Sequence, residues 1–216
     1  MKLPIPDRKA AGRALAALLA EDYRGRDLIV LGLPRGGVPV AAEIARELEA
    51  PLDVLNIRKL GVPFNPELAM GAIASGGIRV LNPDVLRRAG IGHDALEEVV
   101  SMETRELERR ERLYRGDRVR PALAHRIVVL VDDGVATGAS MEAAVEAVRQ
   151  LGPERVVTAV AVAPLEVVDR LEAVADEVVC LATPEPFYAV GSWYEDFSEV
   201  RDGEVRRLLR AEPVPA

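Results

Sequence analysis

The sequence predicts a single α/β domain built around a parallel sheet, and three observations support this. Several short aliphatic runs carry no charge, as strands buried on both faces of a parallel sheet do, and the clearest covers residues 127–131. Apolar residues at helical spacing follow that run, over residues 143–151. A chain of 216 residues that is 49% hydrophobic but only 4% aromatic can bury one large aliphatic core.

Composition excludes several classes of function. Subtracting 35 acidic from 28 basic residues gives a net charge of −7, which disfavours a broad nucleic-acid surface. Cys180 is the only cysteine, so an intrachain disulfide or a thiolate metal cluster cannot form, and two histidines make a zinc site a poor hypothesis. Because no apolar run approaches 18 residues, we expect a soluble, cytoplasmic protein without a membrane partner.

The first elements are a helix, a strand and a second helix. Asp7 is placed to cap a helix that we expect to serve packing only, residues 28–31 form the strand, and residues 40–48 form the second helix. Between the last two lies the turn Arg35-Gly36-Gly37. Its glycines would let backbone amides approach an anion closely, and Arg35 could add a charge-assisted contact. The alternative is an ordinary tight turn.

The next strand is predicted over residues 52–57, and it runs into two cations, Arg58 and Lys59. These side chains either face an anionic ligand or are simply solvated. Residues 61–67, which contain two prolines, form either a lid or a stiff turn.

A hairpin and a long helix follow. Residues 69–74 and 78–81 flank a Ser-Gly-Gly turn, which is a hairpin signal. Residues 93–115 are highly charged, with Glu/Arg pairs four residues apart and a narrow apolar stripe, so they predict an exposed helix. Its stripe could serve a subunit interface, cover a site, or pack on its own domain.

The most informative stretch begins where the strand of residues 127–131 ends. Asp132 and Asp133 come first, and small and hydroxyl residues follow as far as Ser140. Backbone N–H groups near residues 136–139, the positive end of the next helix, and the hydroxyls of Thr137 and Ser140 would bind a phosphate. The two carboxylates repel an anion and suit sugar hydroxyls or a divalent cation instead. The pattern therefore predicts a ribose 5-phosphate site, although the acidic residues could merely cap the helix.

The rest of the chain holds two further strands, at residues 156–163 and 178–182, separated by an amphipathic segment. Residues 183–200, here called the aromatic segment, contain most of the aromatic side chains. Phe187, Tyr188 and Trp193 could stack on a planar base, or the segment could be a small local core. We expect the tail at residues 212–215 to fray.

The pattern of an apolar strand, an acidic pair, two residues and Thr-Gly-x-Ser resembles the phosphoribosyl diphosphate (PRPP) signature of the type I phosphoribosyltransferases. The resemblance implies that Asp132 and Asp133 hold the ribose hydroxyls. It also implies that the loop that follows binds the 5-phosphate, through Ala136, Thr137, Gly138, Ala139 and Ser140. The Arg35-Gly36-Gly37 turn takes the place of the family's pyrophosphate loop, which often contains a non-proline cis peptide. Arg58 and Lys59 fall where the family has a mobile catalytic loop.

The implied fold is a doubly wound, mostly parallel sheet in one domain over residues 1–216. A catalytic-loop hairpin and helical insertion would occupy residues 61–118, and a base-binding hood residues 183–200. The implied reaction transfers phosphoribosyl from magnesium-bound PRPP to a nitrogen acceptor, and a nucleobase is favoured. Magnesium would be bound through PRPP, with Asp132 or Asp133 contributing at most through water. A homodimer is expected from family habit, and a PRPP- or nucleotide-sensing regulator on the same fold is the alternative function.

Overall fold

The centre of the computed structural model, which describes residues 2–211, is a parallel sheet of five strands in the order β2-β1-β6-β7-β8. The predicted α/β fold with a doubly wound, mostly parallel sheet is thus confirmed. The strands have the following bounds: β1 Leu28–Gly32, β2 Leu52–Val54, β6 Ile127–Asp132, β7 Arg155–Val162 and β8 Glu177–Ala182.

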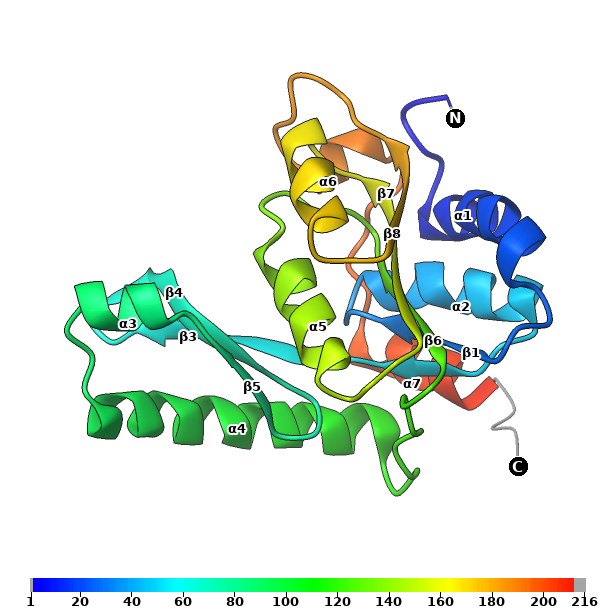
Figure 1. Cartoon of the computed structure of the whole chain (residues 1–216). Coiled ribbons are helices and arrows are strands. Elements are labelled where there is room, and N and C mark those ends of the chain that lie inside the picture. Colours follow the sequence, from blue (N-terminus) through cyan, green and yellow to red (C-terminus); the bar gives the residue numbers. More distant parts are fainter. Residues whose placement is uncertain (1, 212–216) are drawn as a thin grey trace.

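Helices cover both faces of this sheet (Figure 1). On one face pack α1 Arg8–Tyr23, α2 Gly37–Leu48 and α7 Asp202–Ala211, and on the other α5 Ala139–Arg149 and α6 Leu165–Glu172. Alternate residues of β6 enter different cores: Val129 packs under α1 and α2, whereas Val128 packs under α5. Burial on both sides explains why this strand reads as an unbroken aliphatic run.

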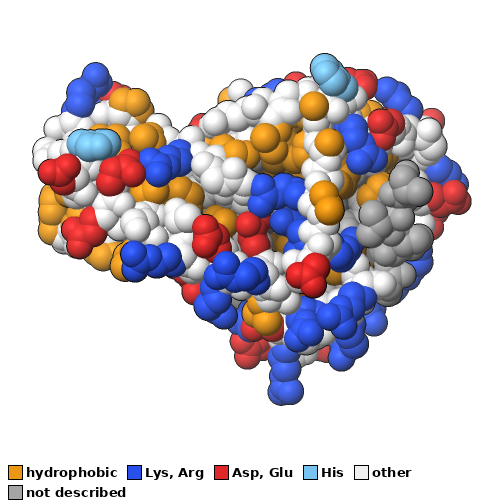
Figure 2. Space-filling model, turned by 90° about the horizontal axis from the view of Figure 1, so that it is seen from below, with side chains coloured by type: hydrophobic (Ala, Val, Ile, Leu, Met, Phe, Trp, Pro, Cys, Tyr) orange, Lys and Arg blue, Asp and Glu red, His pale blue; other side chains and the backbone are white. Residues whose placement is uncertain are grey.

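A second sheet, antiparallel and of three strands, projects from the body as an arm, defined here as residues 57–115. It contains β3 Ile57–Val62, β4 Asn65–Ala74 and β5 Ile78–Leu81, followed by α3 Pro83–Arg88 and α4 His93–Arg115. The arm has its own apolar core, in which Leu60 and Met70 meet Val100 and Leu107. It forms a separate lobe in the space-filling view, with many apolar side chains on its surface (Figure 2).

The predicted strand over residues 52–57 is corrected by the structure of the arm. Residues 52–57 are not one strand, because β2 leaves the parallel sheet after Val54 and β3 begins at Ile57 as part of the arm. Asn56 marks the junction, where its backbone pairs with Ser75 at the end of the hairpin. Arg58 and Lys59 therefore lie within a strand rather than on a loop. An apolar run shows that a segment is extended but not which strands it pairs with.

Two other predictions in this region are confirmed. Strands β4 and β5 form the hairpin across the Ser-Gly-Gly turn, and α4 covers residues 93–115 as expected. Most of its apolar stripe packs on the arm's own sheet, and Leu113 near its end packs on the core of the body. The helix thus packs on its own domain, which was one of the three alternatives. Within residues 61–67 only residues 63 and 64 form a turn, which joins the end of β3 to the start of β4.

The C-terminal part of the chain returns to the N-terminus. The aromatic segment is irregular apart from a short 3-10 helix, Val190–Trp193, and its Tyr194 forms a parallel bridge with Ile5. The predicted fraying concerns residues 212–215, which lie outside the described residues. No helix within residues 2–211 is both long and apolar enough to cross a membrane.

A buried ion pair joins the arm to the body. We expect that removing one of its two partners lowers the stability of the protein considerably. Arg115 of α4 donates to Asp53 of β2 at 2.9 Å, and the two side chains are only 9% and 5% exposed. Replacing Arg115 with Ala leaves a buried carboxylate without its partner, so we expect the free energy of unfolding to fall by about 3–5 kcal/mol. Urea denaturation measures this.

Arg112→Ala is the matched control, because Arg112 forms an exposed pair with Glu108 on the same helix. Its effect should stay within about 0.5 kcal/mol. Equal losses in the two variants would contradict a structural role for the buried pair.

Candidate functional site

Two loops meet at the carboxyl ends of β1 and β6, which are neighbours in the parallel sheet. The first follows β1 and contains Arg35, Gly36 and Gly37, and the second follows β6 and runs from Asp132 to Ser140. The backbone N–H of Leu33 donates to the carbonyl of Val131 at 2.9 Å, which joins the two loops at their base. This edge of an open parallel sheet is where ligands bind.

The glycine turn lies directly against the acidic pair. A β-carbon on Gly36 would lie 2.0 Å from Oδ2 of Asp133, and one on Gly37 would lie 2.4 Å from the carbonyl oxygen of Val131. No side chain fits at either position, so the glycines are required for this close approach. The peptide bond between Pro34 and Arg35 is cis, as the resemblance implies for a pyrophosphate loop.

Burial shapes the electrostatics of the acidic pair. It raises the pKa of Asp132 well above its usual range, and the neighbouring Asp133 carboxylate adds to the effect. Burial also raises the pKa of Asp133, while the guanidinium of Arg8, whose Nε lies 2.7 Å from Oδ2 of Asp133, opposes the shift. Oδ1 of Asp132 accepts from the backbone N–H of Asp133 at 2.9 Å. Oδ2 of Asp132 and Oδ1 of Asp133 accept no hydrogen bond from residues 2–211, so each can accept one from a ligand.

The loop after the acidic pair presents unused backbone donors. Within the described chain, the N–H groups of residues 136–140 donate to no other group, and residues 136, 137, 139 and 140 are exposed. Gly138 has φ 86°, a left-handed conformation, and α5 starts at the next residue. Free amides at a helix N-terminus form a binding site for an anion such as phosphate.

Arg170 of α6 fixes the shape of this loop. Its Nη2 donates to the carbonyl of Thr137 at 2.6 Å, and its Nε donates to Glu142 of α5 at 3.0 Å. Arg170 is absent from the predicted site residues, because nothing in its local sequence pattern distinguishes it from the other exposed arginines.

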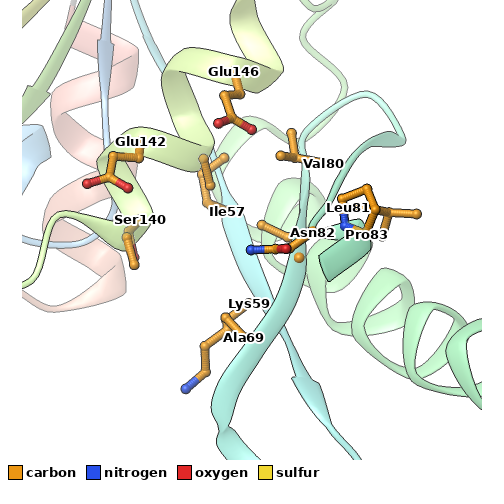
Figure 3. A pocket seen from close by; sticks show the side chains of 14 residues that line it. Ile57, Lys59, Ala69, Val80, Leu81, Asn82, Pro83, Ser140, Glu142 and Glu146 are labelled. Carbon is orange, nitrogen blue, oxygen red and sulfur yellow. The ribbon is translucent and has the colours of Figure 1, made fainter. Parts of the chain in front are cut away.

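Three cavities surround the loop of residues 132–140 and bring most of the predicted residues together. One of about 430 Å³ is lined by Arg35, Gly36 and Asp133. A second of about 380 Å³ contains Ala136, Phe187 and Tyr188. A third of about 360 Å³ lies between the arm and α5 and contains Lys59, Ala139 and Ser140 (Figure 3).

Two predicted residues are placed elsewhere. Arg58 donates through Nε to Glu103 of α4 at 2.6 Å and lines a cavity between the arm strands and α4 rather than any of these three. Trp193 packs with Phe187, with ring centroids 6.4 Å apart, in a small core that also contains Ile5 and Tyr194. The local-core alternative therefore describes Trp193, whereas Tyr188 is 80% exposed.

Besides Arg170, two further residues of the site were not foreseen. Arg8 belongs to α1, a helix expected to serve packing only, yet it binds Asp133. The hydroxyl of Tyr194 donates to the carbonyl oxygen of Asp133 at 2.5 Å, and burial raises the pKa of that hydroxyl above its ordinary value. The only sequence signal for Arg8 is its place next to the Asp7 cap, and that signal does not indicate a distant carboxylate.

Comparison with known proteins agrees with this geometry. Residues 3–192 match the family model described as a phosphoribosyl transferase domain, so the chain belongs to that family. It is 52% identical to "Putative phosphoribosyl transferase MT0597" of Mycobacterium tuberculosis over 209 aligned residues. The alignment covers 97% of this chain and 47% of that protein. The chain thus spans about half the length of the curated relatives it matches.

Solved structures share the fold. The crystal structure of TT1426 from Thermus thermophilus superposes with a TM-score of 0.87 at 50% identity, covering 96% of this chain and 98% of that one. The AQ2163 protein of Aquifex aeolicus has a TM-score of 0.51 at 14% identity, over 96% of this chain and 87% of that one, and supports the fold alone.

The close approach of the glycine turn predicts the effect of adding one methyl group. Gly36→Ala would place that group against Oδ2 of Asp133, so the carboxylate or the turn must move. We expect at least a tenfold loss, as an order of magnitude, in affinity for magnesium pyrophosphate measured by calorimetry.

Gly203→Ala is the control, because no heavy atom lies within 4 Å of the added group. Unchanged affinity in Gly36→Ala would show that the turn does not bind the anion.

Proposed function

We propose that this domain transfers the 5-phosphoribosyl group from magnesium-bound PRPP to a nitrogen acceptor and releases pyrophosphate. One observation carries the proposal: the Gly36-Gly37 turn closes onto the Asp132-Asp133 pair, and a loop of free amides follows directly. Two anion sites on either side of a diol site match the two phosphate ends and the ribose of PRPP. Membership of the phosphoribosyl transferase family supports the same reaction.

Each part of PRPP has a counterpart in the proposed site. The 5-phosphate would accept hydrogen bonds from the amides of residues 136–140 and from the hydroxyls of Thr137 and Ser140. The ribose hydroxyls would donate to the free oxygens of Asp132 and Asp133. The pyrophosphate would lie against the Gly36-Gly37 turn and Arg35, where the N–H of Gly36 donates to no group within residues 2–211 and that of Gly37 donates to the carbonyl of Leu33 at 3.0 Å. Arg35 now pairs with Glu199 at 2.6 Å, and both side chains are exposed, so exchanging this partner costs little.

The donor set fits a magnesium ion bound mainly by the substrate. Within residues 2–211 no group of three or more His, Cys, Asp or Glu side chains could hold a metal. Asp132 and Asp133 offer one free oxygen each, so they could contribute at most a shared or water-mediated contact. The ion would neutralise charge on the leaving pyrophosphate.

The chemistry would require mainly positioning and charge stabilisation. The bond from C1 of the ribose to the pyrophosphate oxygen breaks, and its electron pair leaves with pyrophosphate. The acceptor nitrogen forms the new bond to C1 and then releases its proton to solvent. The transition state has oxocarbenium character, which the adjacent carboxylates would stabilise. Lys59, which lines the cavity beside Ala139 and Ser140, is the arm residue placed to approach the phosphates. Lys59 pairs with Glu67 at 3.5 Å, but this pair is exposed and easily exchanged. Arg58 suits the role less well, because its partner Glu103 is only 15% exposed.

The acceptor would enter the cavity that Ala136 shares with Phe187 and Tyr188. The exposed Tyr188 ring offers a face on which a planar base can stack. Glu166 and Glu185 also line this cavity, so it presents hydrogen-bond acceptors to a nitrogen-rich molecule. The expected homodimer remains a prediction that sedimentation would test.

The first test measures pyrophosphate release with PRPP and Mg²⁺ across a panel of purine and pyrimidine bases. The double variant Asp132→Asn with Asp133→Asn should lower the rate at least about 100-fold, because neutral amides do not stabilise the developing positive charge. Circular dichroism checks that its fold is retained. Release by the native protein with one base would identify the acceptor, whereas PRPP binding without release from any base would favour the sensing regulator.

A second test separates the two interpretations of the aromatic segment, which are a surface that stacks on a planar base and a small local core. Tyr188→Ala should raise the KM for the acceptor about tenfold and leave the KM for PRPP unchanged, because it removes a stacking surface. Trp193→Ala should instead lower the melting temperature, because Trp193 packs in the small core. If Tyr188→Ala changed neither KM, the acceptor would not bind in this cavity.

A further inference from the structure

Arg8 connects the start of the chain to the acidic pair, 125 residues away. Its Nε donates to Oδ2 of Asp133 at 2.7 Å, and its Nη1 donates to the carbonyl of Ser198 at 2.8 Å. The guanidinium also lies over the Phe197 ring, 3.9 Å from its centroid. The Arg8 and Asp133 side chains are only 12% and 11% exposed, so this guanidinium is held on three sides.

The contact uses one carboxylate oxygen and leaves the other free. Oδ2 of Asp133 faces Arg8, and Oδ1 receives no hydrogen bond from residues 2–211. The charge-assisted bond therefore fixes the carboxylate rotamer while keeping one acceptor for a ligand. Tyr194 holds the same residue from the backbone side, through its hydrogen bond to the Asp133 carbonyl.

Arg8 and Arg35 line the same cavity but have different partners. The Arg35–Glu199 pair is exposed, so an incoming anion can replace Glu199. The partner of Arg8 is a buried carboxylate, and separating that pair would leave a buried charge uncompensated. Arg35 can thus exchange Glu199 for a ligand, whereas Arg8 stays bound to Asp133.

We propose that Arg8 is a positioning residue that orients Asp133 toward the ribose hydroxyls and ties residues 194–198 to the acidic pair. The inference rests on the proposed function, because it assigns Asp133 to the ribose. It gives α1 a role in the site and couples the segment next to the acceptor cavity to the ribose-binding carboxylate.

The proposal predicts a change in the pH dependence of PRPP binding. An ionised Asp133 accepts more strongly from ribose hydroxyls than a protonated one does. Its charged or titratable neighbours are Asp132, Tyr194, Arg8, and Arg35 with Glu199 across the cavity. Arg8 lowers the pKa of Asp133, so removing it raises that pKa. Arg8 also lowers the pKa of Asp132, and the two carboxyl groups titrate as a pair, so without Arg8 the binding should weaken at a higher pH as the solution is acidified.

The test compares Arg8→Gln, Arg8→Lys and Arg13→Ala by calorimetric titration with Mg-PRPP between pH 5 and pH 8. Arg8→Gln should bind at least about tenfold more weakly near neutral pH and show the upward shift of the acidic limb. Arg8→Lys should recover the position of that limb, because it restores a positive charge. Arg13 lies on the same helix with an exposed side chain, so Arg13→Ala should match the native protein.

The outcomes separate the two proposals. If the native protein binds no PRPP at any pH, the proposed function fails. If the native protein binds PRPP and Arg8→Gln matches it across the pH range, the positioning role is wrong. A uniform loss in Arg8→Gln without a shift of the acidic limb, and without recovery in Arg8→Lys, would also overturn it, since a purely structural defect behaves in that way.

Discussion

The close contact between the Gly36-Gly37 turn and the Asp132-Asp133 pair is the constraint on which the site depends. It exists because β1 and β6 are adjacent parallel strands, so that their carboxyl ends and the loops that follow emerge side by side. Any β-carbon in the turn would collide with the acidic pair or with its strand. Two loops therefore flank two carboxylates, and the loop that follows β6 presents the free amides of residues 136–140 beside them.

This arrangement has an electrostatic cost, since two adjacent carboxylates are buried and desolvation raises the pKa of both. Arg8, from a distant segment, offsets part of that cost because it lowers the pKa of Asp133. A second distant arginine shapes the loop that follows the pair. Arg8 of α1 holds Asp133, and Arg170 of α6 fixes the carbonyl of Thr137 and the carboxylate of Glu142. The site is thus organised by arginines that meet the central loop only in the folded chain.

The body and the arm contribute different residues to the site. The parallel sheet supplies the acidic pair, the loop of residues 136–140 and the glycine turn, all on short connections from buried strands. The arm has a separate core and brings Lys59 to the cavity beside α5 (Figure 3). Its attachment depends on the buried Arg115–Asp53 pair and on the junction at Asn56 and Ser75.

The sequence alone determined the local features: the aliphatic strand before Asp132, the hairpin, α4 and the resemblance to phosphoribosyltransferases. These are predictable because periodicity, turn residues and a contiguous motif act over a few residues. Tertiary structure decided which strands pair, so the predicted strand over residues 52–57 was wrong. It also decided that Arg58 faces Glu103, that Trp193 packs against the small core around Ile5, and that Arg8 reaches Asp133. Such contacts join residues far apart in the chain, and no local pattern specifies them.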